Sequence, residues 1–257
     1  MTGLTRLHKK ERQKRILAEL RASATIRIPD LAGRFGVSTE TIRRDLDELG
    51  ESGHLNRTYG GAVMRPVGFE PAFSDRFGAM RAERERIAAL ASDLVQPGEG
   101  LMIDGGTTAL HFAQRLATVA KDLTVITNSF PVAMALGVNP AVRVICCPGT
   151  YDPREGIVVG TDTVAFLDRF QANRTITSAS GLTIAGPTEI HSGAAAVKRA
   201  MLGRAADRIL LLDHAKLDRP SLEVVCPLGD LGRLVTDRPL PAHFEAALRD
   251  AGVEVVC

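Results

Sequence analysis

The turn at residues 104–108 combines glycines, hydroxyls and a carboxylate at the start of a helical pattern. Its residues DGGTT follow the apolar run LMI and precede ALHFAQRL. Glycines let a ligand approach the backbone, and the free N–H groups and dipole of a helix N-terminus attract an anion. The turn therefore predicts a phosphate site made of Asp104, Gly105, Gly106, Thr107 and Thr108. The alternative is a glycine-rich turn that binds nothing.

Three further turns with similar residues follow other strand-like runs. They are TNS at 127–129, PGT at 148–150 and SASG at 178–181. Open α/β sheets bind ligands beyond the carboxyl ends of their strands, so we expect the four turns to face one crevice. This convergence favours a ligand site over four unrelated turns. The turns add Thr127, Asn128, Gly149, Ser180 and Gly181 as candidates.

Two lysines are candidates to balance the charge of an anionic ligand. Lys198 lies in the helical run AAAVKRAM, and Lys216 follows a strand-like run that ends at Asp213. An ammonium group beside a phosphate forms a charge-assisted hydrogen bond. Taken singly, each lysine is better explained as a surface residue.

Residues 28–47 predict a different chemistry. The spacing of Ala32, Gly36 and Ile42 fits a helix-turn-helix, in which a small residue lies where the helices touch and a glycine forms the turn. Ser38 suits the N-cap of the second of these helices, because its oxygen can accept a bond from a free N–H group. That helix, TETIRRDLDELG, places Ile42, Leu46 and Leu49 on one face.

The opposite face of this helix carries groups suited to DNA. Arginines can meet phosphates or guanine edges, and threonines can meet phosphates or thymine methyl groups. The alternative is a small helical packing unit whose arginines form a solvated face. The candidates for DNA contact are Ser38, Thr39, Thr41, Arg43, Arg44 and, from the segment that follows, Arg57.

The first region, 1–64, is predicted to be an α+β winged helix-turn-helix domain. Two short β-type runs with paired glycines, HLNRTYGG and AVM, resemble the wing hairpin. Residues 1–65 hold 13 Lys or Arg and 8 Asp or Glu, while the remainder of the chain is net acidic. This asymmetry suggests a polyanionic partner for the first region, or merely uneven surface charge. Residues 65–78 contain two prolines and little periodicity, and we expect a linker there.

The second region, 79–257, alternates helical and strand-like runs. It opens with a helical pattern over 79–95 and ends with the strand-like run VEVV. Short apolar β-rich runs separated by helices predict an α/β Rossmann-like domain, with a mostly parallel sheet covered by helices on both faces.

Two long motifs carry a family resemblance. VSTETIRRDL at 37–46 and GHLNRTYGGA at 53–62 resemble the helix-turn-helix and wing of DeoR-type regulators, and the similarity continues through the second region. The resemblance implies a repressor that binds operator DNA and is released by an effector resembling a sugar phosphate. It also implies that the second region resembles the folds of ribose-5-phosphate isomerase and CoA-transferases.

The resemblance extends to the predicted effector site. It implies roles around the effector for Asp104, Gly106, Thr107, Thr108, Thr127, Asn128, Gly149, Ser180, Gly181, Lys198, Asp213 and Lys216. This chain departs from the usual family pattern in having Gly105 for a serine, Pro148 for a glycine and DHAKL for D-x-x-K-F. His191 stands near a position that is commonly acidic, as a ligand contact or an exposed loop residue. These departures bear on which effector binds.

Composition and motifs limit the remaining functions. No run of about 18 uncharged apolar residues predicts a membrane span. The basic N-terminal segment lacks the apolar stretch of a signal peptide. The four cysteines lack metal-ligand spacing; they are Cys146, Cys147, Cys226 and Cys257. We expect reduced core thiols, with Cys257 as a free terminal one, and therefore a cytoplasmic protein. We expect no metal and no cofactor.

Two alternatives remain open at this stage. The first is a sugar-phosphate isomerase, in which Asp104 or Asp213 serves as the base and Lys198 stabilises an enediolate. It leaves the DNA-binding region without a role. A purely architectural DNA-binding protein leaves the large second region without one. We therefore expect a regulator that is not an enzyme and that acts as a dimer or tetramer, because one helix-turn-helix buries too little surface for tight specific binding.

Overall fold

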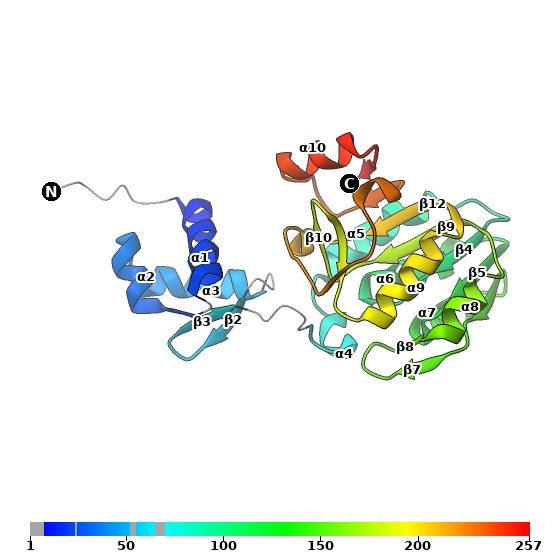
Figure 1. Ribbon diagram of the computed structural model, residues 1–257, viewed down its shortest axis with the longest axis horizontal. Helices are drawn as coiled ribbons and strands as arrows, with labels where there is room; N and C mark the ends of the chain where they lie inside the picture. Colours follow the sequence, from blue (N-terminus) through cyan, green and yellow to red (C-terminus); the bar gives the residue numbers. More distant parts are fainter. Residues whose placement is uncertain (1–7, 24, 52–54, 65–69) are drawn as a thin grey trace. The chain divides into compact units, whose positions relative to one another are not determined.

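The computed structural model describes residues 8–23, 25–51, 55–64 and 70–257, and the chain divides into two units (Figure 1). The first unit is Met1–Phe69 and the second is Glu70–Cys257. Within the described residues, each unit has its own core of buried apolar side chains.

The linker expected over 65–78 is wrong at its C-terminal end. Residues 65–69 lie outside the described residues, but residues 70–78 belong to the second unit. Helix α4 (Phe73–Phe77) is docked there by the ring of Phe77, which stacks on His111 with centroids 5.1 Å apart. Two prolines and a lack of periodicity gave no helical pattern in the sequence here. The ring of Phe77 holds this short helix on the second unit.

The first unit is a three-helix domain with a small antiparallel sheet. Its elements are α1 (Lys9–Ser23), β1 (Thr25–Arg27), α2 (Ile28–Phe35), α3 (Thr39–Glu51), β2 (Leu55–Thr58) and β3 (Gly61–Met64), with strand order β1-β3-β2. Ile16 and Leu20 of α1 pack with Ile42 and Leu46 of α3 in the core. A buried ion pair between Arg12 and Asp45 joins the same two helices.

Local sequence explains the turn between α2 and α3. Pro29 occupies the first turn of α2, and Gly36 ends the helix with φ +61°, a left-handed conformation that glycine adopts without strain. The Oγ of Ser38 accepts a hydrogen bond from the N–H of Thr41 at 3.2 Å, as expected of an N-cap. Helix α3 includes Gly50 and continues to Glu51.

The second unit is built around a seven-stranded sheet in which every pairing is parallel. The strand order is β15-β14-β12-β9-β4-β5-β6. The strands are β4 (Gly100–Ile103), β5 (Leu123–Thr127), β6 (Val142–Cys146), β9 (Ala172–Ser178), β12 (Ala205–Leu211), β14 (Arg233–Val235) and β15 (Glu254–Val256). The chain first builds outward from β4 to β6 and then returns to β9 on the other side of β4. The strand order therefore reverses between β4 and β9.

Helices cover both faces of this sheet, as predicted (Figure 1). Leu101 and Ile103 pack with α5 (Arg81–Ser92), α6 (Thr107–Val119) and α7 (Phe130–Leu136), whereas Met102 packs with α8 (Thr161–Leu167) and α9 (Ser192–Leu202). Because alternate residues of a strand face opposite sides, this pattern requires a sheet buried on both faces. Helix α10 (Ala242–Asp250) packs on a neighbouring part of the core through Phe244 and Leu248.

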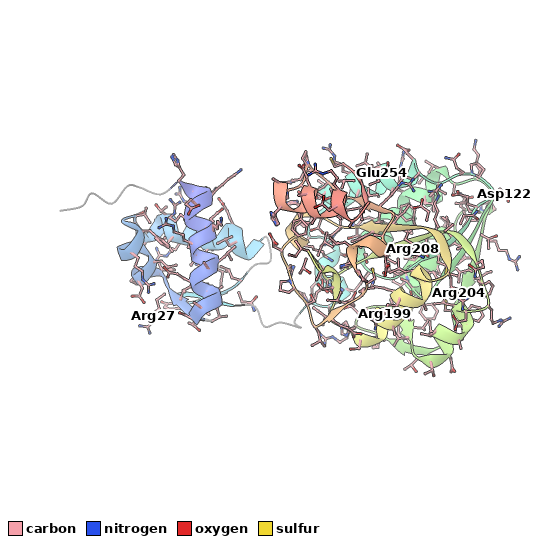
Figure 2. The ribbon with its side chains drawn as sticks, turned by 45° about the horizontal axis from the view of Figure 1, so that its top comes forward. Arg27, Asp122, Arg199, Arg204, Arg208 and Glu254 are labelled. Carbon is pink, nitrogen blue, oxygen red and sulfur yellow. The ribbon has the colours of Figure 1, made fainter. Side chains whose placement is uncertain are left out.

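Smaller elements surround the large sheet. A hairpin pairs β7 (Thr150–Asp152) with β8 (Ile157–Val159), and a second small sheet has the order β10-β11-β13, from β10 (Gly181–Thr183), β11 (Gly186–Glu189) and β13 (Glu223–Val224). The last of these strands, β13, has only two residues. Arg199 of α9, labelled in Figure 2, ties that strand to the helix through an ion pair of 2.5 Å with Glu223. Two short 3-10 helices, η1 (His214–Lys216) and η2 (Leu228–Asp230), complete the unit.

Two further expectations can be compared with the structure. In the described part of the chain, no helix combines the length and apolar character needed to cross a membrane. Cys147 and Cys226 are buried free thiols as expected, and burial raises the pKa of Cys147 to about 12. Cys146 is wrong as a core residue, because it is exposed near the end of the edge strand β6.

Candidate functional site

The helix α3 presents its polar face to solvent. Ile42, Leu46 and Leu49 are buried in the core, whereas Thr39, Arg43 and Arg44 are exposed. The guanidinium groups of Arg43 and Arg44 lie 3.5 and 3.6 Å from the carboxylate of Glu40. These exposed pairs are weak, so both arginines are available for exchange with an external anion.

The wing hairpin of β2 and β3 adds a second polar surface to this unit. Arg57 is bound within the unit: it pairs with Asp47 of α3 at 2.9 Å and donates to the carbonyl oxygen of Gly61 at 2.8 Å. Tyr59, which the sequence analysis placed in a β-type run without a role, lies in the turn of the hairpin and is fully exposed. An aromatic residue at the tip of a wing is a further candidate for contact with DNA.

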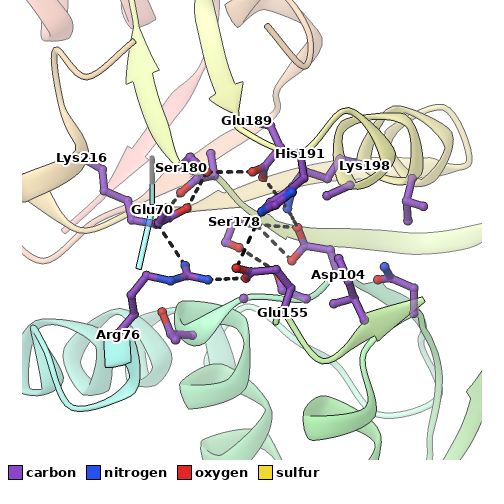
Figure 3. Close-up of a pocket in the computed structure, with 18 residues that line it drawn as sticks. Glu70, Arg76, Asp104, Glu155, Ser178, Ser180, Glu189, His191, Lys198 and Lys216 are labelled. Carbon is purple, nitrogen blue, oxygen red and sulfur yellow. Dashed lines mark hydrogen bonds and ion pairs between the residues drawn. The ribbon is translucent and has the colours of Figure 1, made fainter. Parts of the chain in front are cut away.

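A pocket in the second unit lies at the reversal of strand order. Asp104 follows β4, and its carboxylate accepts the backbone N–H of Ser178, the last residue of β9, at 3.1–3.2 Å (Figure 3). The start of α6 at Gly106 and Thr107 lines the same pocket. Reversal points in parallel sheets are the usual place for ligands, since two strands leave a crevice between their loops.

One group of charges in the pocket centres on Lys198 of α9. Its ammonium pairs with Asp104 and lies 3.4 Å from the carboxylate of Glu189. Burial lowers the pKa of Lys198, but the two acids outweigh it and raise the pKa above its ordinary value. Complete burial raises the pKa of Asp104 to about 6, although Lys198 and the N–H of Ser178 oppose the shift. At neutral pH both partners are therefore charged, and each holds the other in place.

A second group of charges joins four segments of the chain (Figure 3). Glu70 lies 3.1 Å from Arg76, 3.8 Å from Lys216 and 2.8 Å from the hydroxyl of Ser180. Arg76 also pairs with Glu155, which lies 3.9 Å from His191. Burial would raise the pKa of Glu70, but Lys216, Arg76 and Ser180 outweigh it and hold the pKa below its ordinary value.

Two buried polar atoms in this pocket are left without partners. The Oγ1 of Thr107 and the Oδ1 of Asn128 have no hydrogen-bond partner among the described residues, although both side chains are buried. Buried polar groups are normally satisfied, so each of these atoms calls for a ligand or water. The side chains leave a cavity of about 30 Å³, which is room for about two waters. A larger ligand has to move some of these side chains.

The structure brings together only part of the predicted effector site. The predicted residues that line the pocket are Asp104, Gly105, Gly106, Thr107, Asn128, Ser180, Lys198 and Lys216. Thr108, Thr127, Gly149, Gly181 and Asp213 do not line it, so the turn at 148–150 does not join the other three turns. Asp213 lies behind the pocket, 3.6 Å from Arg84.

The glycines at these turns are explained by packing. A Cβ on Gly181 would lie 1.8 Å from the carbonyl oxygen of Arg219, and one on Gly149 would lie 2.1 Å from the hydroxyl of Thr163. A Cβ on Gly105 would lie 2.2 Å from the side chain of Ile157. A serine at this position would therefore require Ile157 to move.

Several residues of the pocket were not predicted. Glu70, Arg76 and Glu155 lie in segments with no motif, and sequence spacing carries no signal that they meet. Glu189 lies two residues before His191, near the position that the family resemblance gives as commonly acidic. The sequence therefore held a signal for the acid beside Lys198. His191, considered in the sequence analysis, does line the pocket. Among the described residues, no group of His, Cys, Asp and Glu side chains is arranged to hold a metal ion.

Two family models match this chain. Residues 12–65 match the DeoR-like helix-turn-helix domain, and residues 80–238 match the DeoR C terminal sensor domain. The HTH-type transcriptional regulator YulB of Bacillus subtilis is 32% identical over 95% of both chains. The glycerol-3-phosphate regulon repressor of Escherichia coli is 28% identical over 95% of this chain and 97% of its own.

Solved structures are similar at a lower level. The tetrameric eIF2B-beta2-delta2 complex from C. thermophilum matches with a TM-score of 0.50 and 15% identity, over 94% of this chain and 72% of that chain. This likeness concerns the fold alone. Ribose 5-phosphate isomerase A from Methanocaldococcus jannaschii matches with a TM-score of 0.40 and 16% identity, over 54% of this chain and 55% of its own.

Proposed function

Because this chain belongs to the DeoR family of DNA-binding transcription regulators, we propose that it represses a carbohydrate or polyol operon and leaves its operator when a phosphorylated effector binds. The helix-turn-helix unit reads the operator, and the second unit senses the effector. The regulator then acts in the cytoplasm, where its operator DNA is.

The observation that carries the proposed effector class is the pair of unpartnered atoms in the pocket. The hydroxyl of Thr107 stands at the start of α6, where free N–H groups and the helix dipole favour a phosphate. The Oδ1 of Asn128 is an acceptor only, so its partner must be a donor such as a sugar or polyol hydroxyl. A small phosphorylated sugar, polyol or hydroxy acid carries both groups. The name of the glycerol-3-phosphate regulon repressor connects a similar chain with a compound of this class.

The surface of α3 supports the DNA half of the proposal. Its exposed Thr39, Arg43 and Arg44 offer the contacts that a recognition helix makes in the major groove. Exposed Tyr59 at the turn of the wing is placed to contact the DNA backbone beside that groove. Two such units in a dimer or tetramer read two half-sites.

The test begins with double-stranded DNA selected from a random library by the full-length protein. Binding of the selected duplex is then followed by fluorescence anisotropy while glycerol 3-phosphate, ribose 5-phosphate or another sugar phosphate is added. We expect at least one phosphorylated compound to release the DNA and its dephosphorylated form to leave the complex intact. Release by both forms, or by no phosphorylated compound in a broad panel, would contradict the effector class.

One observation favours an isomerase as a second candidate. The pKa of about 6 for Asp104, beside the cation Lys198, suits a carboxylate that accepts a proton at neutral pH. However, both Asp104 oxygens lie within hydrogen-bond distance of the N–H of Ser178, and one is also bound by Lys198, so we propose a structural role and no enzyme activity. Conversion of ribose 5-phosphate to ribulose 5-phosphate by the purified protein, abolished in Asp104→Asn, would overturn this.

A further inference from the structure

The pocket has more carboxylates than lysine and arginine side chains in its lining, which is unexpected for a phosphate site. Its lining residues include the carboxylates of Glu70, Asp104, Glu155 and Glu189, against the cations Arg76, Lys198 and Lys216 (Figure 3). An added phosphate brings up to two more negative charges into a buried space, where like charges repel strongly. The departure of one carboxylate would reduce this repulsion and so favour binding.

Three of the four carboxylates are held by the body of the second unit. Asp104 accepts the N–H of Ser178 and pairs with Lys198. Glu189 ends β11 and accepts the N–H of Ile190 at 2.8 Å. Glu155 lies in the turn between β7 and β8 and pairs with Arg76. Each of these three residues lies at a strand end or in a hairpin of the fold.

Glu70 is attached differently. It is the first residue of the second unit and precedes α4, outside any strand or helix. Its carboxylate contacts Arg76 and Lys216, which are two of the three cations, and so offsets positive charge that would attract an external anion.

The contact between Glu70 and Ser180 is also shared. The Oγ of Ser180 lies 2.8 Å from an oxygen of Glu70 and 2.8 Å from an oxygen of Glu189. A hydroxyl has one proton to donate, so it satisfies only one of the two carboxylates at a time. When Glu70 leaves, the hydroxyl of Ser180 can still donate to Glu189. The free-energy cost of moving Glu70 is therefore smaller.

We propose that Glu70 is an internal anion that competes with the effector: it lies on Arg76 and Lys216 when the pocket is empty, and the phosphate of the effector binds at the start of α6 when Glu70 leaves these two cations. This inference rests on the proposed function of the pocket. Residues 65–69 join Glu70 directly to the helix-turn-helix unit along the chain. Displacement of Glu70 therefore changes the pocket and the first residue of the second unit in one step.

The variant Glu70→Gln tests the proposal in the full-length protein, with inorganic phosphate and glycerol 3-phosphate as probes. Glutamine keeps the size of the side chain and removes the charge that competes with the probe. We expect titration calorimetry to give at least ~10-fold tighter binding in the variant, because the site no longer has to be vacated. Glu85→Gln, in an exposed ion pair on α5, is the matched control and should bind as the wild type does.

Tighter binding alone would also follow from reduced repulsion, so hydrogen exchange provides the second measurement. The N–H of Phe73 is bonded to the carbonyl oxygen of Arg154 at 3.0 Å and reports the docking of α4. In the wild type, probe binding should speed exchange over residues 73–77. In Glu70→Gln, exchange there should already be fast and unaffected by the probe.

The outcomes separate this proposal from the function on which it rests. If wild type and Glu70→Gln bind the probes equally, or if exchange over 73–77 is unchanged on binding, the role of Glu70 is wrong and the anion site stands. If neither protein binds glycerol 3-phosphate, phosphate or the sugar phosphates of the panel, the proposed function fails and this inference fails with it.

Discussion

Thr107 and Thr108 are adjacent and equally buried, yet the structure gives them different surroundings. Thr107 lines the pocket and its hydroxyl has no partner among the described residues, whereas Thr108 does not line the pocket. The sequence motif predicts that both contact the phosphate, because a motif shows residue types and not the direction of each side chain. Direction follows from the helical twist at the start of α6.

This difference gives a paired prediction. Thr107→Val should weaken binding of the phosphorylated effector by about 10- to 100-fold, the worth of a hydrogen bond to a charged group, and should not lower stability. Thr108→Val should bind within about 3-fold of wild type, since it leaves the backbone donors in place. Titration calorimetry and thermal melting measure both effects. A larger loss of affinity in Thr108→Val than in Thr107→Val would contradict the assignment.

At the scale of elements, the two glycines of the wing have separate roles. A Cβ on Gly61 would lie 1.9 Å from the carbonyl oxygen of Ile26 in β1, whereas a Cβ on Gly60 meets nothing within 4 Å. Close approach of β3 to β1 thus depends on Gly61 alone.

We therefore expect Gly61→Ala to lower the free energy of unfolding of the first unit by about 1–3 kcal/mol, as overpacking does. Gly60→Ala should change it by less than about 0.5 kcal/mol, as most exposed substitutions do. Urea denaturation followed by circular dichroism measures the two variants. Equal destabilisation by both would show that the hairpin turn, rather than the packing of β3, sets the requirement.

Helix α3 carries the next prediction. Arg43→Ala and Arg44→Ala should each weaken binding to the selected operator by about 1–3 kcal/mol where the side chain meets a guanine, and less where it meets a phosphate. Anisotropy titrations at several salt concentrations distinguish the two, because a lost phosphate contact reduces the salt dependence. Arg15→Ala, at an exposed position of α1, is the control. Circular dichroism checks that α3 remains folded. Wild-type affinity in both variants would remove α3 from the interface.

Elements with strong local patterns were predicted well, and those fixed by distant partners were not. The helix-turn-helix followed from Gly36, Ser38 and the apolar spacing of α3, and the parallel sheet from short apolar runs between helices. Helix α4 was missed because Phe77 finds its partner His111 far along the chain. Arg76 and Glu155 were not predicted for the same reason. The two residues of an ion pair that forms between distant segments have no characteristic spacing in the sequence.

At the scale of the whole molecule, each chain offers one recognition helix. A single unit buries too little surface for tight specific binding, so two related half-sites should be bound by a dimer or tetramer. Sedimentation velocity of the free protein and of its complex with the selected duplex should give an even number of chains. Monomers in both states would contradict this prediction.

The close packing of side chains in the pocket also affects the rate at which an effector binds. With about 30 Å³ between its side chains, we expect the pocket to admit a phosphorylated sugar only after its ion pairs have opened. When opening precedes binding, the observed association rate levels off at the opening rate as the effector concentration rises. Once the effector is abundant, the protein and not the effector concentration then sets the rate of binding.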